Sequence, residues 1–268
     1  MRRAAAGLMA GACAAFLAAA PAAAQGDPAA APRDTSRWTG VGALASYTSF
    51  SDDPKDWQLY AVTLTHHQPR GSLIGRVNMA SRFGTTGVQV EGDAWRMFDH
   101  GRYMYLNAGY SGSSVFPTQR AGVEFYQNFP GAWEGSLGAR GLWFDGTPVT
   151  LLTGTIGKYF GNAWASARPF VRFKDSGVAT SLTLISRQYG ADANHYIGGR
   201  VTMGSSPTDR ITPDAIGRTN SLSLGVQGAL TSGRSLFATW DIGYDAEELS
   251  AARTRRGWTL TVELTHRK

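Results

Sequence analysis

The histidines are the residues of this chain best suited to acid–base or metal chemistry, and their placement argues against both. His66 and His67 are adjacent near the end of a predicted strand, where neighbouring side chains point to opposite faces, so the pair is a poor metal chelate. No His-Glu-x-x-His, Gly-x-Ser-x-Gly or phosphate-loop motif occurs. A barrel hydrolase acting on lipid or lipopolysaccharide needs a Ser/His/acid set near its outer rim. Asp192, His195 and Ser205 form a candidate set, but the predicted loop order puts His195 on the periplasmic side. We therefore predict no catalytic residues, no cofactor and no metal.

Charged residues inside strongly alternating segments are the second chemically informative set. An Arg or Lys that faces lipid at mid-depth in a bilayer costs roughly 2–4 kcal/mol. If these segments cross a membrane as strands, most of the charges must therefore face inward. We predict that the following residues line a lumen: Arg76, Arg82, Glu91, Asp93, Glu124, Glu134, Arg140, Lys158, Arg168, Arg172, Arg187 and Arg200.

Two interpretations of this inventory remain open. In the first, a basic wall lines a polar channel that favours anionic or sugar substrates. In the second, Arg–Glu and Arg–Asp pairs brace a solid lumen, because a small barrel is filled by its own side chains whereas a barrel of sixteen strands leaves a channel. Arg168 and Arg172 share one face with no acid between them, so they are the best candidates for a strip that contacts an anion or a glycan.

The clearest positioning element is the segment from Asn220 to Asp245. In its first run, Leu222 and Leu224 begin an apolar face and alternate with serine and glycine. Thr231-Ser232-Gly233 then turns the chain, and a second alternating run follows that includes Trp240 and Tyr244 on its apolar face. The period and the turn residues predict a β-hairpin with one apolar and one polar face.

The same alternation extends over most of the chain and predicts about fourteen strands. Their approximate bounds are Trp38–Phe50, Asp56–Gln68, Leu73–Phe83, Gly87–Trp95, Tyr103–Ser111, Arg120–Gln127, Ala132–Trp143, Pro148–Phe160, Trp164–Phe173, Val178–Tyr189, His195–Gly204, Ser221–Leu230, Ser235–Tyr244 and Arg255–His266. No apolar run after the N-terminal region reaches the roughly 18–20 residues that a membrane helix needs. The sequence therefore predicts an all-β fold, a closed antiparallel transmembrane barrel of about 12–14 strands.

The connections support this topology. If the first strand starts in the periplasm, the odd-numbered connections face outward, and they include the long ones: Ser51–Lys55, Gly112–Thr118, Ser205–Thr219 and Ala246–Thr254. The even-numbered connections are mostly tight. Long loops at one end and short turns at the other are typical of outer-membrane barrels. Aromatic residues near strand ends fit the interfacial girdles of such proteins: Trp38, Trp57, Phe83, Trp95, Trp143, Tyr159, Trp164, Tyr244 and Trp258.

The N-terminal region predicts export. Arg2 and Arg3 precede an apolar run to Ala20, and small residues follow, so we predict a signal peptide over residues 1–24, a flexible periplasmic stub over 25–36 and the barrel over 37–268. The only cysteine lies inside the predicted signal, so the mature chain has no disulfide framework. Without Arg2 and Arg3 the chain has 24 Lys+Arg against 20 Asp+Glu, a balance too mild to indicate nucleic acid as a partner.

Several segments resemble the YaiO family of outer-membrane β-barrels. The most distinctive is Gly154-Thr155-Ile156-Gly157-Lys158-Tyr159-Phe160-Gly161, and the resemblance extends from about Trp38 to the C-terminus. The shorter segments are Ser81-Arg82-Phe83-Gly84, Tyr105-Leu106-Asn107-Ala108-Gly109-Tyr110-Ser111, Phe116-Pro117, Arg168-Pro169-Phe170 and Gly204-Ser205-Ser206-Pro207. The resemblance implies an outer-membrane barrel in a family whose biochemical role is largely unassigned. Barrel proteins commonly end on an aromatic residue, and this chain ends instead on His266-Arg267-Lys268.

These observations define the expected function. We expect an integral barrel of a Gram-negative outer membrane that acts as a channel or export pore for a polar solute or glycan. The alternative is a structural or surface-interaction barrel with a plugged lumen, and an outer-membrane lipid-modifying enzyme is a third, less favoured hypothesis. The expected partners are outer-membrane lipid and lipopolysaccharide, the barrel-assembly machinery during biogenesis, and a glycan or small polar solute.

Overall fold

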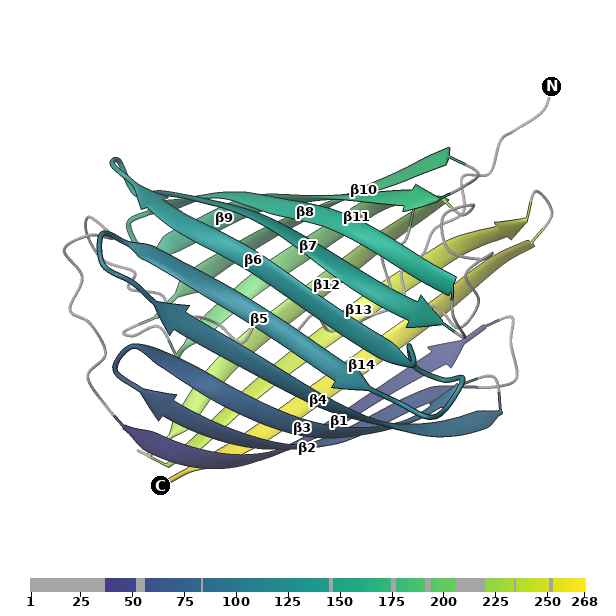
Figure 1. The fold of residues 1–268 in the computed structure, drawn as a ribbon, viewed down its shortest axis with the longest axis horizontal. Coiled ribbons are helices and arrows are strands. Elements are labelled where there is room, and N and C mark those ends of the chain that lie inside the picture. Colours follow the sequence, from purple (N-terminus) through teal and green to yellow (C-terminus); the bar gives the residue numbers. More distant parts are fainter. Residues whose placement is uncertain are drawn as a thin grey trace.

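The computed structural model is a closed, all-antiparallel barrel of fourteen strands (Figure 1). It describes residues 37–51, 56–82, 84–144, 147–174, 177–190, 194–205, 220–233, 235–250 and 253–268. The predicted signal peptide, the predicted stub and most of the predicted loop Ser205–Thr219 lie outside the described residues. No described helix is long and apolar enough to span a membrane.

Each predicted strand corresponds to one strand of the barrel. The strands are β1 Trp38–Phe50, β2 Trp57–Gln68, β3 Gly71–Arg82, β4 Thr85–Met97, β5 Arg102–Tyr110, β6 Gln119–Phe129, β7 Trp133–Phe144, β8 Thr147–Phe160, β9 Ala163–Lys174, β10 Gly177–Tyr189, β11 Tyr196–Ser205, β12 Asn220–Ser232, β13 Leu236–Ser250 and β14 Arg253–Arg267.

The first and last strands close the barrel. β1 pairs with β14 from Gly40–Arg267 to Phe50–Gly257. Two backbone hydrogen bonds between Thr39 and Lys268 extend this seam to the last residue. The Arg267 guanidinium lies 4.6 Å from the ring of Trp38 and 4.5 Å from that of Phe237. A membrane-spanning sheet must have no lipid-exposed edge, and the pairing of β1 with β14 removes the two edges that an open sheet would have.

Burial along the strands is inverted relative to a soluble protein. Outward-facing side chains are large, apolar and exposed, among them Leu137 at 78%, Ile156 at 64% and Val178 at 62%. Inward-facing side chains are often polar and buried, such as Glu124 and Gln89. Apolar-out and polar-in alternation is the arrangement of a barrel in lipid.

The two ends of the barrel differ as the loop lengths predicted. Trp38 at the start of β1 and Arg267 at the end of β14 lie at the same end of the barrel as the short turns at residues 69–70, 130–132 and 161–162. Figure 1 shows the C-terminus at this end. We orient this end to the periplasm. The opposite, extracellular end carries the connections after β1, β5 and β11.

One predicted outer loop is largely strand. Residues Ala246–Thr254 were expected to form a long connection, but β13 continues to Ser250 and β14 begins at Arg253. The prediction was wrong because inward charges pair across the extended hairpin. Glu247 and Arg255 are register partners, with a 2.7 Å ion pair that buries both side chains.

Candidate functional site

The candidate site is the inner wall of the barrel. All the predicted lumen-lining residues except Lys158 alternate in phase with inward, buried positions of their strands. Among the described residues there is no cluster of His, Cys, Asp or Glu that could hold a metal ion.

Lys158 is the residue that the structure places elsewhere. On β8 it alternates in phase with Ile156 and Phe160, which are 64% and 58% exposed on the outer face. Its Nζ lies 4.5 Å from the ring centroid of Trp133 and 5.4 Å from that of Phe160. The prediction erred because it counted Lys158 among the charges that must face inward without considering its depth in the membrane. Lys158 is two residues from the periplasmic turn, where a long cationic side chain reaches the headgroup layer.

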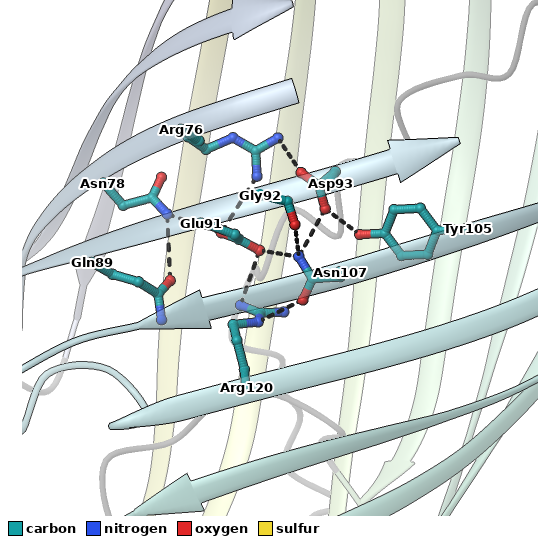
Figure 2. A network of polar contacts seen from close by, with 9 residues as sticks. All are labelled: Arg76, Asn78, Gln89, Glu91, Gly92, Asp93, Tyr105, Asn107 and Arg120. Atoms are coloured by element: carbon teal, nitrogen blue, oxygen red, sulfur yellow. Dashed lines mark hydrogen bonds and ion pairs between the residues drawn. The ribbon is translucent and has the colours of Figure 1, made fainter. Parts of the chain in front are cut away.

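At the centre of the wall, two acids and two arginines from β3, β4 and β6 form one network (Figure 2). Arg76 contacts Glu91 at 3.5 Å and Asp93 at 3.3 Å. Arg120 reaches Glu91 from the other side at 3.5 Å. Asn107 lies between them and donates to Glu91 and to Asp93, both at 2.8 Å. Arg120 was not among the predicted residues, although it alternates in phase with Glu124.

Further polar side chains complete the shell of this network. Asn78 donates to Glu91 at 3.0 Å, and the Tyr105 hydroxyl donates to Asp93 at 2.6 Å. Both acids therefore have their lone pairs occupied by donors from neighbouring strands. Hydrogen bonds to a carboxylate are among the stronger ones, so these donors order the side chains around both acids.

In three ion pairs of this wall, the arginine is more exposed to water than its acidic partner. The side chains of Arg76, Arg120 and Arg140 are 13%, 16% and 20% exposed. Glu91 and Glu124, their partners, are 7% and 1% exposed. In these three contacts the guanidinium groups are therefore more accessible to the lumen than the carboxylates, whereas in the pair of Arg200 and Asp241 the acid is the more exposed side chain, at 22% against 17%.

Inward glycines let two of these arginines lie along the wall. A Cβ at Gly109 on β5 would come within 2.9 Å of Cγ of Arg120, which crosses from β6. At Gly122 on β6, a Cβ would lie 3.2 Å from Cγ of Arg140. Side chains laid over neighbouring glycines leave space toward the barrel axis, which extended side chains would fill.

A second ion pair spans several strands. Arg168 on β9 donates to both carboxylate oxygens of Glu124 on β6, at 3.1 and 2.9 Å. It also donates to the Tyr126 hydroxyl at 3.0 Å, and Ser136 donates to Glu124 at 2.6 Å. Arg168 is therefore held by an acid that sequence spacing does not place near it. Arg172, the other residue of the strip predicted to contact an anion or a glycan, is buried on the same inner face of β9.

The remaining predicted arginines also have defined surroundings. Arg200 contacts Asp241 at 2.9 Å near the middle of β11 and β13. Arg187 lies over the rings of Trp164 and Tyr196, at 5.5 and 4.6 Å. In a separate part of the wall, the Arg82 guanidinium lies 5.3 Å from the ring of Trp57. Besides Arg120, the inward charges of the described strands that were not predicted are Asp241, Asp245, Glu247, Arg255, Glu263 and Arg267.

Aromatic side chains fill part of the periplasmic half of the lumen. Tyr103 and Tyr126 stack with ring centroids 4.4 Å apart, and Trp95 packs on Tyr105 at 4.7 Å. The Tyr103 hydroxyl donates to Glu134.

The interfacial-girdle prediction was wrong for the aromatic residues that face inward, namely Trp38, Trp57, Trp95, Tyr159 and Trp164. Trp143, Tyr244 and Trp258 lie on the outer face, and Phe83 is outside the described residues.

The extracellular loop between β5 and β6 folds inward. Val115 and Phe116 are 1% and 8% exposed and pack on Ala80 and Leu59, which face inward from β3 and β2. β5 is the shortest strand, so residues 85–89 of β4 have no partner in β5. Ser111 covers part of that edge by donating to the Val88 carbonyl oxygen at 2.6 Å. We call residues 111–118 the inward loop.

The candidate catalytic set does not assemble. His195 precedes β11 at the periplasmic end and contacts the Thr231 hydroxyl at 3.0 Å. Ser205 ends β11 ten residues later, about 33 Å away at the rise of a strand. Asp192 lies outside the described residues. His66 and His67 point to opposite faces, since His66 is exposed and His67 is buried.

The comparisons agree with this architecture. A model of the YaiO membrane beta barrel domain matches residues 39–209, more than half of the chain. The chain belongs to this family. The match contains all the segments that carry the sequence resemblance, but it ends before β12, whereas the resemblance was predicted to reach the C-terminus. No curated protein matches the sequence.

One solved structure of low sequence identity shares the fold of this YaiO-family barrel. The CymD monoaromatic hydrocarbon channel aligns with a TM-score of 0.59 at 8% identity, over 90% of this chain and 91% of that chain. The outer membrane protein OpdK from Pseudomonas aeruginosa and an anion-selective porin from Comamonas acidovorans have TM-scores of 0.48 and 0.47, each at 8% identity over 87% of this chain and 98% and 99% of theirs. The fold likeness rests on the first of these.

Proposed function

We propose that this protein is a narrow, gated outer-membrane channel for small anionic or polar solutes. The observation that carries the proposal is the greater exposure of Arg76, Arg120 and Arg140 on the inner wall, while their acidic partners Glu91 and Glu124 are buried. A lumen whose water-accessible charges are mainly of one sign, inside low-dielectric walls, concentrates ions of the opposite sign. A glycan is a second class of solute consistent with this donor-rich wall.

The inward loop is the proposed gate. Its Val115 and Phe116 occupy the extracellular half of the lumen, where Leu142 and Phe144 also face inward. A connection between two strands can move more readily than the barrel wall, because fewer backbone hydrogen bonds hold it. In this proposal, a solute passes when the loop moves away from Ala80 and Leu59.

A closed structural barrel is the second candidate. The stacked Tyr103 and Tyr126, and the buried bridge between Glu124 and Arg168, favour it because they fill one sector of the periplasmic half. In that case the connections at the extracellular end would carry the function. We propose no catalytic role, because His195 and Ser205 lie at opposite ends of β11.

The proposed cellular setting follows from the sequence. Residues 1–24 would direct export, and the barrel-assembly machinery would insert the mature chain among phospholipid and lipopolysaccharide. The outer, apolar face of the barrel supports insertion into a bilayer, since its large side chains are exposed.

Single-channel recording of the refolded barrel in a planar bilayer tests the proposal. We expect brief ohmic openings, and we expect the double variant Arg120→Gln, Arg140→Gln to lose anion preference while still conducting. Arg96→Gln is the matched control, because Arg96 faces outward on β4. Wild-type and variant barrels that insert but never conduct would support the closed structural barrel instead.

A further inference from the structure

A groove on the outer face of the barrel crosses β7 to β14 and has a volume of about 1210 Å³. Its lining is almost entirely apolar. The apolar walls include Ile156, Leu184, Leu224 and Trp240. In a membrane barrel this surface faces lipid, so the medium that fills the groove is acyl chain rather than water.

The floor of the groove follows one row of register partners. Lys158 is opposite Ala165, Ala165 is opposite Ser186, Ser186 is opposite Gly199, and Gly199 is opposite Val226. The groove therefore runs across the strands and begins at Lys158. From β8 to β13 it covers five strand spacings, roughly 24 Å. One leaflet of a bilayer contributes about 15 Å of hydrocarbon, so the groove is long enough for one slanted acyl chain.

Lys158 supplies the only charged side chain at the periplasmic end of this groove among its described lining residues. The rings of Trp133 and Phe160 hold its ammonium group at 4.5 and 5.4 Å. The neighbouring turn at 161–162 places this group at the periplasmic membrane surface. An ammonium group at headgroup depth is complementary to a phosphate, and aromatic rings at that depth are typical of the interface.

We propose that this groove is a binding site for one glycerophospholipid of the periplasmic leaflet. The phosphate pairs with Nζ of Lys158, and one acyl chain lies along the row Ala165, Ser186 and Gly199. A similar groove of about 1000 Å³ on the opposite side, around Gly75 and Ala108, has no lysine in its lining. It is therefore an internal reference for non-specific lipid contact.

Native mass spectrometry of the protein extracted from outer membranes in mild detergent tests the site. We expect wild-type protein to retain one phospholipid, and Lys158→Gln to retain about fivefold less, the factor that one basic residue contributes near an anionic headgroup. Gly199→Leu should also lose the lipid by filling the floor, since a Cβ there meets nothing closer than 3.7 Å and the wall itself is not strained.

Two control variants separate specific binding from general lipid contact. Gly75→Leu fills the reference groove, where a Cβ meets nothing within 4 Å, and should leave the retained lipid unchanged. Arg102→Gln removes an exposed, outward cation from the same end of the barrel, and it should also have no effect. Heat-modifiable gel mobility verifies that each variant is folded.

Three outcomes would overturn the proposal. The first is equal lipid retention in wild type, Lys158→Gln and Gly199→Leu. The second is an equal loss in the control variants. The third is retention of lipopolysaccharide in place of phospholipid, which would contradict the assigned leaflet.

Discussion

The bridge between Glu124 and Arg168 gives the sharpest quantitative prediction. In Glu124→Ala, Arg168 loses both carboxylate acceptors and stays in a site where its side chain is 6% exposed. Breaking a buried pair by removing one partner typically costs about 3–5 kcal/mol, because the other charge is left without compensation. We expect a loss of this size in the free energy of unfolding.

Urea unfolding of the barrel in lipid vesicles, followed by tryptophan fluorescence, measures this loss. The double variant Glu124→Leu, Arg168→Met removes both charges and should lie within about 1 kcal/mol of wild type, since apolar replacement of a whole buried pair is often neutral. Asp99→Asn is the surface control. Its partner Arg70 is 53% exposed, and exposed pairs contribute at most about 1 kcal/mol.

Either of two results would refute this reasoning. A cost below about 1 kcal/mol for Glu124→Ala would mean that water screens the bridge. A double variant as unstable as the single one would mean that shape, and not charge, makes the site sensitive.

Two further predictions concern the lumen. Gly109→Val should destabilise the barrel by about 1–3 kcal/mol and lower anion preference, because the new side chain displaces Arg120 from the wall. Gly75→Val, on the outer face where a Cβ meets nothing within 4 Å, should do neither in the same unfolding and bilayer assays. Phe116→Ala should raise the open probability of single channels by loosening the inward loop, whereas Phe125→Ala, on the outer face at 58% exposure, should leave it unchanged.

Strand number, order and facing could be predicted from the sequence because side-chain alternation and turn residues are local signals. The hairpin from Asn220 to Asp245 has the faces that its alternation predicts. The end of a strand is less certain, as Glu247 and Arg255 show. Their charges resembled a polar loop, but cross-strand pairing makes them part of the wall.

Contacts across the lumen could not be predicted from the sequence. Arg168 reaches Glu124 because the closed wall curves β6 and β9 toward one another, and no local spacing encodes that curvature. The placement of Lys158 depends on its depth in the membrane, which alternation alone does not give. The inward loop had a usable signal, since Val115 and Phe116 are apolar residues in a segment expected to face water.

The reversal potential of wild-type channels in a potassium chloride gradient tests the central claim most directly. A narrow lumen whose arginines face water predicts a reversal potential displaced toward that of chloride. A reversal potential displaced toward that of potassium would contradict the account. So would bilayers that stay silent for both wild type and Phe116→Ala after verified insertion.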